Sequence, residues 1–192
     1  SELARPAWDG SNSLAYDDAT VRAMDPARGG LSLPGWDESY TKEELRTLLA
    51  RYESVDAARL WHNLQTFLEA VIPVAHGAGI KMAIHPDDPP WDIFGLPRII
   101  TNEANLARFL KLVDMPENGL TFCTGSLGAD PANDLIRMVH RFGDRIAFAQ
   151  VRNIRFTGEK QVLEVAHPTE CGSLDIYGIL KALHEAQFDG YM

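Results

Sequence analysis

Three short apolar runs, each ending in a polar side chain, constrain the fold of this chain more than any other feature of its sequence. Runs of this length, bounded by proline, glycine or polar residues, are typical of buried strands. Patterns with helical spacing separate them, and strands that alternate with helices indicate an α/β fold with a parallel sheet. The runs end at His85, Cys123 and Gln150.

The spacing of these positions indicates a particular α/β fold. Cys123 follows His85 by 38 residues and precedes Gln150 by 27, and one strand–helix unit of a (β/α)8 barrel takes about 31 residues. Each position then lies near the carboxyl end of its own strand, where barrel side chains converge on one mouth. We therefore predict part of a TIM (β/α)8 barrel. Its parallel strands, adjacent in chain order, are expected near 80–85, 119–124 and 146–152.

The first of these strands leads into a rigid polar loop, His85-Pro86-Asp87-Asp88-Pro89-Pro90. Each proline fixes φ and lacks an N–H, so the loop cannot continue as a central strand. Asp87 and Asp88 place two carboxylates beside His85, at the edge of the sheet where α/β folds build their sites. Capping a turn is the simpler explanation for at least one of these aspartates.

Composition narrows the class of protein. The chain has 192 residues, of which 45% are hydrophobic and 23% charged, a globular composition that suits one domain or a large part of one. Its net charge of −9 argues against nucleic acid or an anionic membrane as the main partner. No apolar run reaches the length of about 18 residues that spans a membrane. Two cysteines give no disulfide framework, so we expect a cytoplasmic location.

Glycine and proline divide the chain into two regions. We predict an irregular arm or excursion over residues 1–40 and an incomplete (β/α) barrel region over 41–192. In the second region a hairpin is expected over 155–165, and a further strand opens at Tyr191. Because that strand would hold only two residues, we expect the chain to be part of a longer protein. The expected helix caps are Thr41, Thr101 or Asn102, Asp130 and Ser173.

Several of these stretches resemble mannonate dehydratase. The resemblance covers about Tyr40 to Met192 and implies a TIM barrel of roughly twice this length. It implies removal of water from D-mannonate to give 2-keto-3-deoxy-D-gluconate in hexuronate catabolism, with Mn²⁺ or Fe²⁺ as cofactor. We also expect a homo-oligomer. The matching stretches are His85–Pro90, Gly95–Ile99, Cys123–Ser126, Val151–Asn153, Glu164–His167 and Gly172–Asp175.

The resemblance also implies a metal site. Two of the family's ligands match His85 and Cys123, and a second family histidine is replaced here by Gln150. A neutral amide oxygen is a weaker ligand than imidazole. The family's last ligand, an Asp, and its catalytic His lie in a Pro-Asp-His-Gly motif expected just past Met192, so no catalytic residue is predicted within the chain.

The remaining polar residues leave alternatives open. Arg152 could bind a substrate carboxylate through its planar fork or pair with an acid of the chain. Asn153 is a similar candidate, and His167 faces either the site or solvent. Taken alone, Cys123 reads as a small buried hydrophobe, and a lone strand-end histidine as a packed residue. The other histidines lie in helical patterns and are expected at the surface; they are His62, His76, His140 and His184.

Three functions are compatible with these residues. A metal-dependent lyase is favoured by His85 together with Cys123. A catalytically silent relative that binds a sugar acid or a partner is favoured by Gln150. A sugar isomerase on a related barrel is the third possibility, and Cys123 counts against it because metal sites in such enzymes are mostly carboxylate and histidine.

Overall fold

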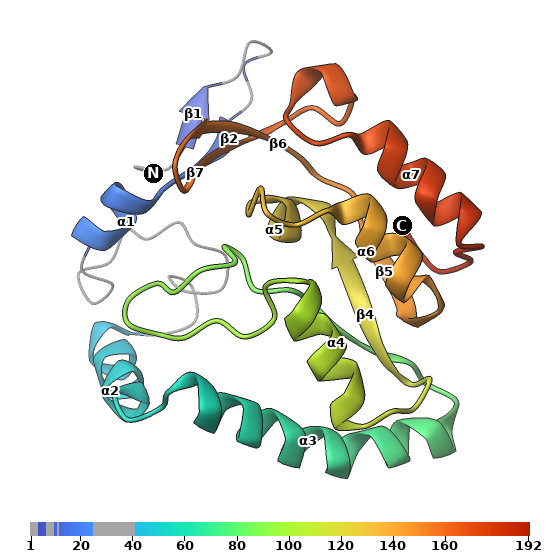
Figure 1. Ribbon diagram of the computed structural model, residues 1–192. Coiled ribbons are helices and arrows are strands. Elements are labelled where there is room, and N and C mark those ends of the chain that lie inside the picture. The colour runs from blue at the N-terminus through green and yellow to red at the C-terminus, as the bar shows by residue number, and fades with distance from the viewer. Residues whose placement is uncertain (1–3, 7–9, 11, 25–40) are drawn as a thin grey trace.

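The structure, a computed structural model, describes residues 4–6, 10, 12–24 and 41–192. Two sheets lie on either side of a central cavity, with helices around the first sheet (Figure 1). The strands are β1 (Ala4–Pro6), β2 (Asn12–Asp17), β3 (Met82–Ile84), β4 (Asn118–Cys123), β5 (Ile146–Gln150), β6 (Asn153–Gly158) and β7 (Gln161–Val165). The helices are α1 (Asp18–Ala23), α2 (Lys42–Tyr52), α3 (Ala57–Ala78), α4 (Glu103–Leu112), α5 (Thr124–Gly128), α6 (Leu135–Phe142) and α7 (Ile176–Glu185).

The first sheet is parallel and has the order β3-β4-β5, which confirms the three strands predicted from the apolar runs. Cys123 stands beside Gln150 in the register of β4 and β5. Tyr191 forms an isolated parallel bridge with Phe148 on the free side of β5, and its carbonyl accepts a 2.9 Å hydrogen bond from Ala149 N. The strands therefore follow one another in chain order, as consecutive strand–helix units require.

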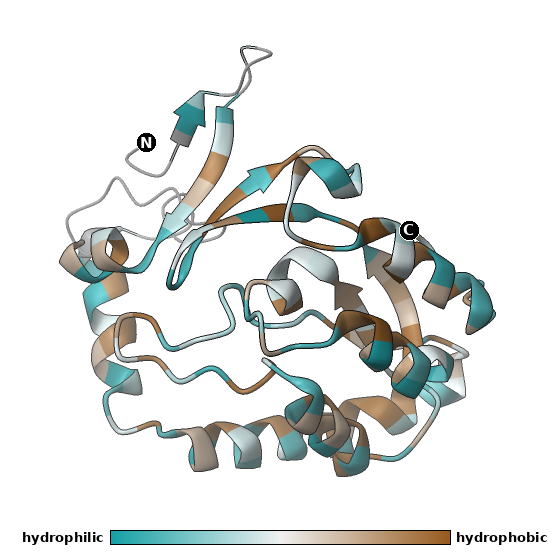
Figure 2. Cartoon of the chain, turned by 45° about the horizontal axis from the view of Figure 1, so that its top comes forward, coloured by the Kyte–Doolittle hydropathy of each residue, from teal (hydrophilic) through white to brown (hydrophobic). Residues whose placement is uncertain are grey.

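The core lies between the parallel sheet and its helices. Every residue of β4 is buried, because a parallel strand covered on both faces has no solvated side. Phe122 from β4 packs in one cluster with Ile72 of α3, Phe109 of α4 and Met138 of α6. Figure 2 shows the parallel strands mostly in hydrophobic colours, whereas the hairpin strands carry a mixture. This rigid layer holds the carboxyl ends of three strands at one edge.

Local capping chemistry explains where the helices begin. Thr41 caps α2 in a reciprocal capping box with Glu44, as the sequence predicts, and Asn102 caps α4. The cap predicted at Asp130 is wrong, because that carboxylate accepts from Ala132 N in a turn and α6 begins only after Asp134.

The cap predicted at Ser173 is also wrong. Its hydroxyl instead accepts from Phe156 N in β6, at 3.1 Å. The α7 helix is capped two residues later by Asp175, whose side chain accepts from Gly178 N. Ser173 therefore fastens the end of the hairpin to the segment that leads into α7.

The second sheet is antiparallel and has the order β1-β2-β7-β6. The β6–β7 hairpin confirms the hairpin expected over 155–165. Strand β2 joins it by pairing Ala15 with Leu163, so the described part of residues 1–40 holds strands and a helix where the sequence predicted an irregular arm. Residues 25–40 of that arm lie outside the described residues, and the boundary at residue 41 stays a prediction. In the described ranges no helix combines the length and the apolar character needed to cross a bilayer.

Candidate functional site

A cavity of about 410 Å³ lies where the carboxyl ends of the parallel strands face the antiparallel sheet. Its volume is within the range of small-molecule sites. Its walls combine strand-end polar groups with apolar side chains from β2, β6 and β7. The lining residues include His85, Asp87, Asp88, Arg98, Gly125, Gln150, Arg152 and Glu164 on the polar side, and Leu14, Tyr16, Ile93, Ile154 and Val162 on the other.

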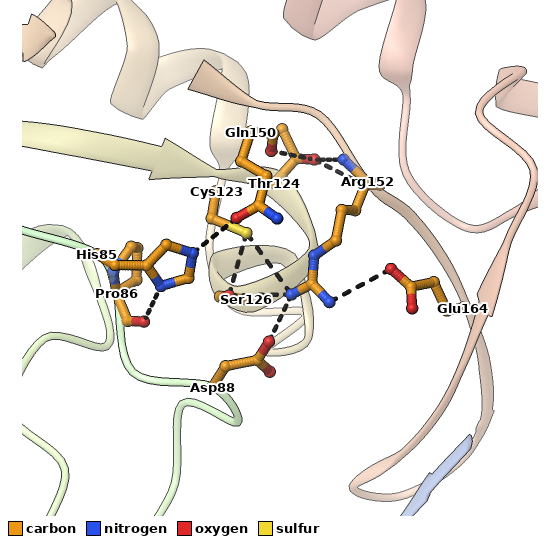
Figure 3. Close-up of polar contacts among 9 residues, drawn as sticks. All are labelled: His85, Pro86, Asp88, Cys123, Thr124, Ser126, Gln150, Arg152 and Glu164. Atoms are coloured by element: carbon orange, nitrogen blue, oxygen red, sulfur yellow. Dashed lines mark hydrogen bonds and ion pairs between the residues drawn. The ribbon is translucent and has the colours of Figure 1, made fainter. Parts of the chain in front are cut away.

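Two of the three predicted strand-end side chains, His85 and Gln150, line this cavity, and the fully buried Cys123 lies beside them (Figure 3). Nε2 of His85 lies 2.8 Å from Oε1 of Gln150, and the Cys123 thiol is within hydrogen-bonding reach of the same imidazole. Nδ1 of His85 lies 2.7 Å from the carbonyl oxygen of Pro86. Because the Pro86 carbonyl and the Gln150 amide oxygen can only accept, both ring nitrogens carry a proton in this arrangement, and Nε2 is the nitrogen turned toward Gln150 and Cys123.

The ionisation of His85 and Cys123 is coupled. The hydrogen bond with Cys123 raises the pKa of His85 to about 9, although burial opposes it. Burial by itself would raise the pKa of the Cys123 thiol, but the hydrogen bond with His85 and the charge of Arg152 outweigh it and lower this pKa to about 7. Part of the Cys123 thiol is therefore ionised at neutral pH, and the thiolate is the form of cysteine that binds metal.

The donor set has an imidazole nitrogen, a thiolate sulfur and an amide oxygen. Among the described residues no group of three or more His, Cys, Asp and Glu side chains is placed to hold a metal ion. A third donor beside His85 and Cys123 is therefore present only if the Gln150 amide oxygen is counted. Mixed soft and hard donors suit Fe²⁺, Mn²⁺ or Zn²⁺ and do not select one of them. The arrangement fits part of a first-row metal site.

Arg152 is the cation beside these donors. Its Nη2 donates to Asp88 in a short ion pair, to Ser126 Oγ at 3.1 Å and to Cys123 Sγ at 3.6 Å. Its Nη1 donates to Glu164 Oε1 at 3.4 Å. Of the two alternatives left open by the sequence, pairing with acids of the chain is the one observed. The side chain nevertheless lines the cavity and remains within reach of a bound anion.

The turn after β4 holds Arg152 by its main chain as well. The Thr124 hydroxyl accepts from Arg152 N at 2.8 Å and donates to Arg152 O at 2.6 Å. The Ser126 hydroxyl donates to Cys123 Sγ at 3.1 Å. The residues of this turn form the short helix α5. Thr124 and Ser126 were missed as site residues because their partner, Arg152, follows the next strand of the sheet and no local pattern identifies it.

The antiparallel sheet contributes Tyr16 and Glu164, which the sequence reasoning also missed. Tyr16 is only 8% exposed, its hydroxyl accepts from Trp91 Nε1 at 3.0 Å, and burial raises its pKa to about 12. A usable signal existed for Glu164: it stands two residues from Val162, so both side chains face the same side of β7. Tyr16 gave no such signal, because its strand was not recognised.

Asn153 and His167 were predicted as substrate-binding residues, but neither is among the residues that line the cavity. Asn153 is fully buried, and its Nδ2 donates to three successive carbonyl oxygens, of Ala166, His167 and Pro168. This carboxamide shapes the loop after β7. The His167 side chain is exposed at the surface.

The remaining polar predictions can also be placed. Asp87 accepts from the backbone N–H groups of Ile99 and Ile100, both at 2.8 Å, which confirms that at least one aspartate of the loop has a capping role. The four helical histidines are exposed as predicted: His62, His76, His140 and His184.

Comparison with known proteins was made on the whole chain. A family model for D-mannonate dehydratase (UxuA) matches residues 1–192. Mannonate dehydratase 2 from Halalkalibacterium halodurans is 50% identical over 192 residues, which are 99% of this chain and 56% of the relative. A mannonate dehydratase from Thermotoga petrophila is 47% identical over 203 residues, covering 100% of this chain and 56% of the relative.

A solved structure gives the same result in three dimensions. The crystal structure of mannonate dehydratase from Streptococcus suis serotype 2 superimposes with a TM-score of 0.85 at 38% identity. The match covers 98% of this chain and 51% of that one. The present chain therefore spans about half the length of the relatives that it matches.

Proposed function

The chain belongs to the D-mannonate dehydratase (UxuA) family, and on that basis we propose that the protein is a carbon–oxygen lyase. It removes water from D-mannonate to give 2-keto-3-deoxy-D-gluconate, a step of hexuronate catabolism. The observation that carries this proposal is the convergence of His85, Cys123 and Gln150 beside Arg152, next to a cavity that His85, Gln150 and Arg152 line. A metal-binding group and a cation are what the turnover of a sugar acid requires.

We further propose that the parallel sheet is one part of a TIM (β/α)8 barrel. Three parallel strands in chain order, with Tyr191 bridging on the next side of β5, are the arrangement that a singly wound barrel repeats. The cavity lies at the carboxyl ends of the strands, where barrel enzymes have their active sites. The helices α3, α4, α6 and α7 correspond to its outer ring (Figure 1).

The metal would be Mn²⁺ or Fe²⁺, held by the His85 imidazole, the Cys123 thiolate and, more weakly, the Gln150 amide oxygen. When bound, such an ion stabilises the negative charge that develops as a proton is lost next to a carboxylate. The hydrogen bond between His85 Nδ1 and Pro86 O orients the ring so that Nε2 is turned toward Gln150, and Nε2 is the nitrogen that would hold the ion. No residue of 1–192 is assigned as the general base or acid.

Arg152 would orient the substrate carboxylate. Its guanidinium presents several donors in one plane, the geometry that matches a carboxylate. Asp88 and Glu164 fix that plane and would share it with a bound anion. Asn153 contributes indirectly, through the loop after β7, and His167 remains a prediction without a contact to the cavity. A homo-oligomer and a cytoplasmic location also remain predictions.

The alternative of a catalytically silent relative is not favoured. The similar proteins at 46–50% identity carry the name mannonate dehydratase, and His85 and Cys123 are brought together as a metal site requires. The replacement at Gln150 weakens the donor set without removing it, because the amide oxygen faces the same point.

The natural full-length protein can test this function. After treatment with a chelator it should form 2-keto-3-deoxy-D-gluconate from D-mannonate only when Mn²⁺ or Fe²⁺ is added, and D-gluconate, the epimer at C2, should be a poor substrate. His85→Ala should abolish this turnover, and His184→Ala, at an exposed position of α7, should not. Turnover that is independent of metal, or unaffected by His85→Ala, would contradict the proposal.

A further inference from the structure

Gly125 stands in α5 with its Cα facing the side chain of Arg152. A Cβ atom placed on Gly125 would lie 2.8 Å from Arg152 Nε and 2.9 Å from Cζ, closer than real Cβ contacts come. The backbone of Gly125 is not in the left-handed region, which among the described glycines is occupied by Gly10, Gly79 and Gly95. Glycine is therefore required here by space and not by conformation.

A glycine also weakens the short helix that contains it, since alanine is the better helix former by about 1 kcal/mol. Its presence in α5 is explained by the Arg152 side chain, for which it leaves space. Arg152 Nε is buried and, among the described residues, has no hydrogen-bond partner. The guanidinium therefore lies with this edge against the glycine and its terminal nitrogens turned toward the cavity.

The residues around Gly125 complete a socket for the same arginine. Thr124 holds the main-chain N and O of Arg152, and Ser126 accepts from Nη2 at 3.1 Å. Cys123 receives the same nitrogen at 3.6 Å. Each residue of the Cys-Thr-Gly-Ser segment therefore lies against Arg152. Thr124 fixes its main chain, whereas Cys123 and Ser126 fix its guanidinium (Figure 3).

We propose that Gly125 is a positioning residue, which sets the Arg152 guanidinium beside the Cys123 sulfur and in reach of the substrate carboxylate. This inference rests on the proposed function for the part that concerns the substrate. The part that concerns the position of Arg152 is independent of it. A methyl group at residue 125 would push the guanidinium away from Ser126 and Cys123, toward Asp88 and Glu164.

The test compares Gly125→Ala with Gly128→Ala in the natural full-length protein. Gly128 lies in the same helix and is equally crowded, but its Cβ would meet Leu174 Cδ2 at 2.8 Å instead of a polar group. Gly125→Ala should lower kcat/KM for D-mannonate by about 100-fold, the cost of a misplacement near 1 Å. Gly128→Ala should lower the melting temperature and leave kcat/KM within about twofold.

Coupling to Arg152 separates positioning from general damage. The effects of the two substitutions should not add. In an Arg152→Ala background, Gly125→Ala should change kcat/KM by no more than about twofold, which is the usual scatter of such comparisons. A full 100-fold loss in that background would overturn the proposal. If Gly125→Ala alone fails to fold, the double variant with Arg152→Ala should fold, because the obstructed side chain is gone; failure of both would also overturn it.

Crystal structures of the wild type and of Gly125→Ala provide a readout that does not depend on activity. The proposal expects the guanidinium to lose its contacts with Ser126 Oγ and Cys123 Sγ in the variant, and it is wrong if both contacts persist. If the wild-type protein does not dehydrate D-mannonate, the proposed function fails while these structures still decide the position of Arg152.

Discussion

The two sheets that enclose the cavity contribute to it in different ways. All six residues of β4 in the parallel sheet are buried, and its neighbours β3 and β5 bring His85 and Gln150 to the same edge. The antiparallel sheet is half-covered: in β7 all five residues are of intermediate exposure, and the last four of β6 are exposed. Its contribution is Tyr16, Glu164 and an apolar wall.

The difference between the two sheets indicates which of them positions the donor atoms. Donor atoms that must meet within hydrogen-bonding distance come from the ends of three adjacent parallel strands, of which the central one, β4, is paired on both sides and wholly buried. Side chains that only enclose or orient a ligand come from a sheet with a solvated face. Substitutions at the parallel edge should therefore affect chemistry more than stability, and substitutions in the antiparallel sheet should do the reverse.

Cys123→Ala should have the largest effect, because it removes the thiolate from the donor set. We expect a loss of bound Mn²⁺ or Fe²⁺ and a fall in kcat of more than about 100-fold, beyond the range typical for outer partners of a metal site. Cys171→Ala is the matched control, since that cysteine lies in the segment between β7 and α7 and not at the end of a parallel strand. Metal content by mass spectrometry and the dehydratase assay measure both variants. Equal metal content in the two variants would contradict the claim that the parallel sheet supplies the metal ligands.

Gln150→His should have the second largest effect, because it places a stronger metal ligand at the edge of the parallel sheet. Imidazole is a stronger ligand than a neutral amide oxygen for first-row divalent ions. We expect Mn²⁺ affinity to rise by about tenfold, the smaller end of the effects known for partners of metal ligands. Titration of Mn²⁺ into both proteins measures it. No change would mean that position 150 does not face the metal.

Tyr16→Phe tests the antiparallel side. The variant leaves the half-buried Trp91 indole N–H without the acceptor that it has at 3.0 Å, a loss of about 1–2 kcal/mol of stability. The melting temperature should fall, while kcat changes by less than about tenfold. Tyr177→Phe, at a side chain that is 74% exposed, should change neither. A collapse of kcat with an unchanged melting temperature would place Tyr16 in the chemistry instead.

Glu103→Gln should have the smallest effect, because this residue belongs to the helix layer outside both sheets. Hydrogen bonds from Arg141 and then Arg137 lower the pKa of Glu103. The ion pairs therefore stabilise the protein above the ordinary carboxyl pKa, and this contribution is lost as pH falls through the lowered value. At pH 7 the wild type should have the higher melting temperature. Its free energy of unfolding should exceed that of Glu103→Gln by about 1 kcal/mol or less. The difference should shrink as pH falls below the ordinary carboxyl pKa, and a constant difference would contradict the assignment.

Sequence alone predicted the parallel half of this molecule well. Buried parallel strands are continuous apolar runs, so the ends at His85, Cys123 and Gln150 could be located without a structure. The caps of α2 and α4 were equally local, since Thr41 and Asn102 bond within their own first turn.

The rest depended on contacts that are distant in sequence. Ser173 was a reasonable cap, but its hydroxyl bonds to Phe156 in the neighbouring hairpin. Strand β2 is a strand because it pairs with β7 from the other end of the chain, and nothing in residues 12–17 specifies that partner. The surroundings of Arg152 were missed for the same reason, because they come from Asp88, the α5 turn and Glu164.

The central claim, that the three strand ends form one metal site, is tested most directly by anomalous diffraction. Crystals of the natural full-length protein grown with Mn²⁺ should be measured on both sides of the manganese absorption edge. We predict an anomalous peak within about 2.5 Å of His85 Nε2, Cys123 Sγ and Gln150 Oε1, the range of metal–ligand distances for such donors. A peak bound elsewhere, or none near His85 and Cys123 in crystals of active protein, would contradict the claim.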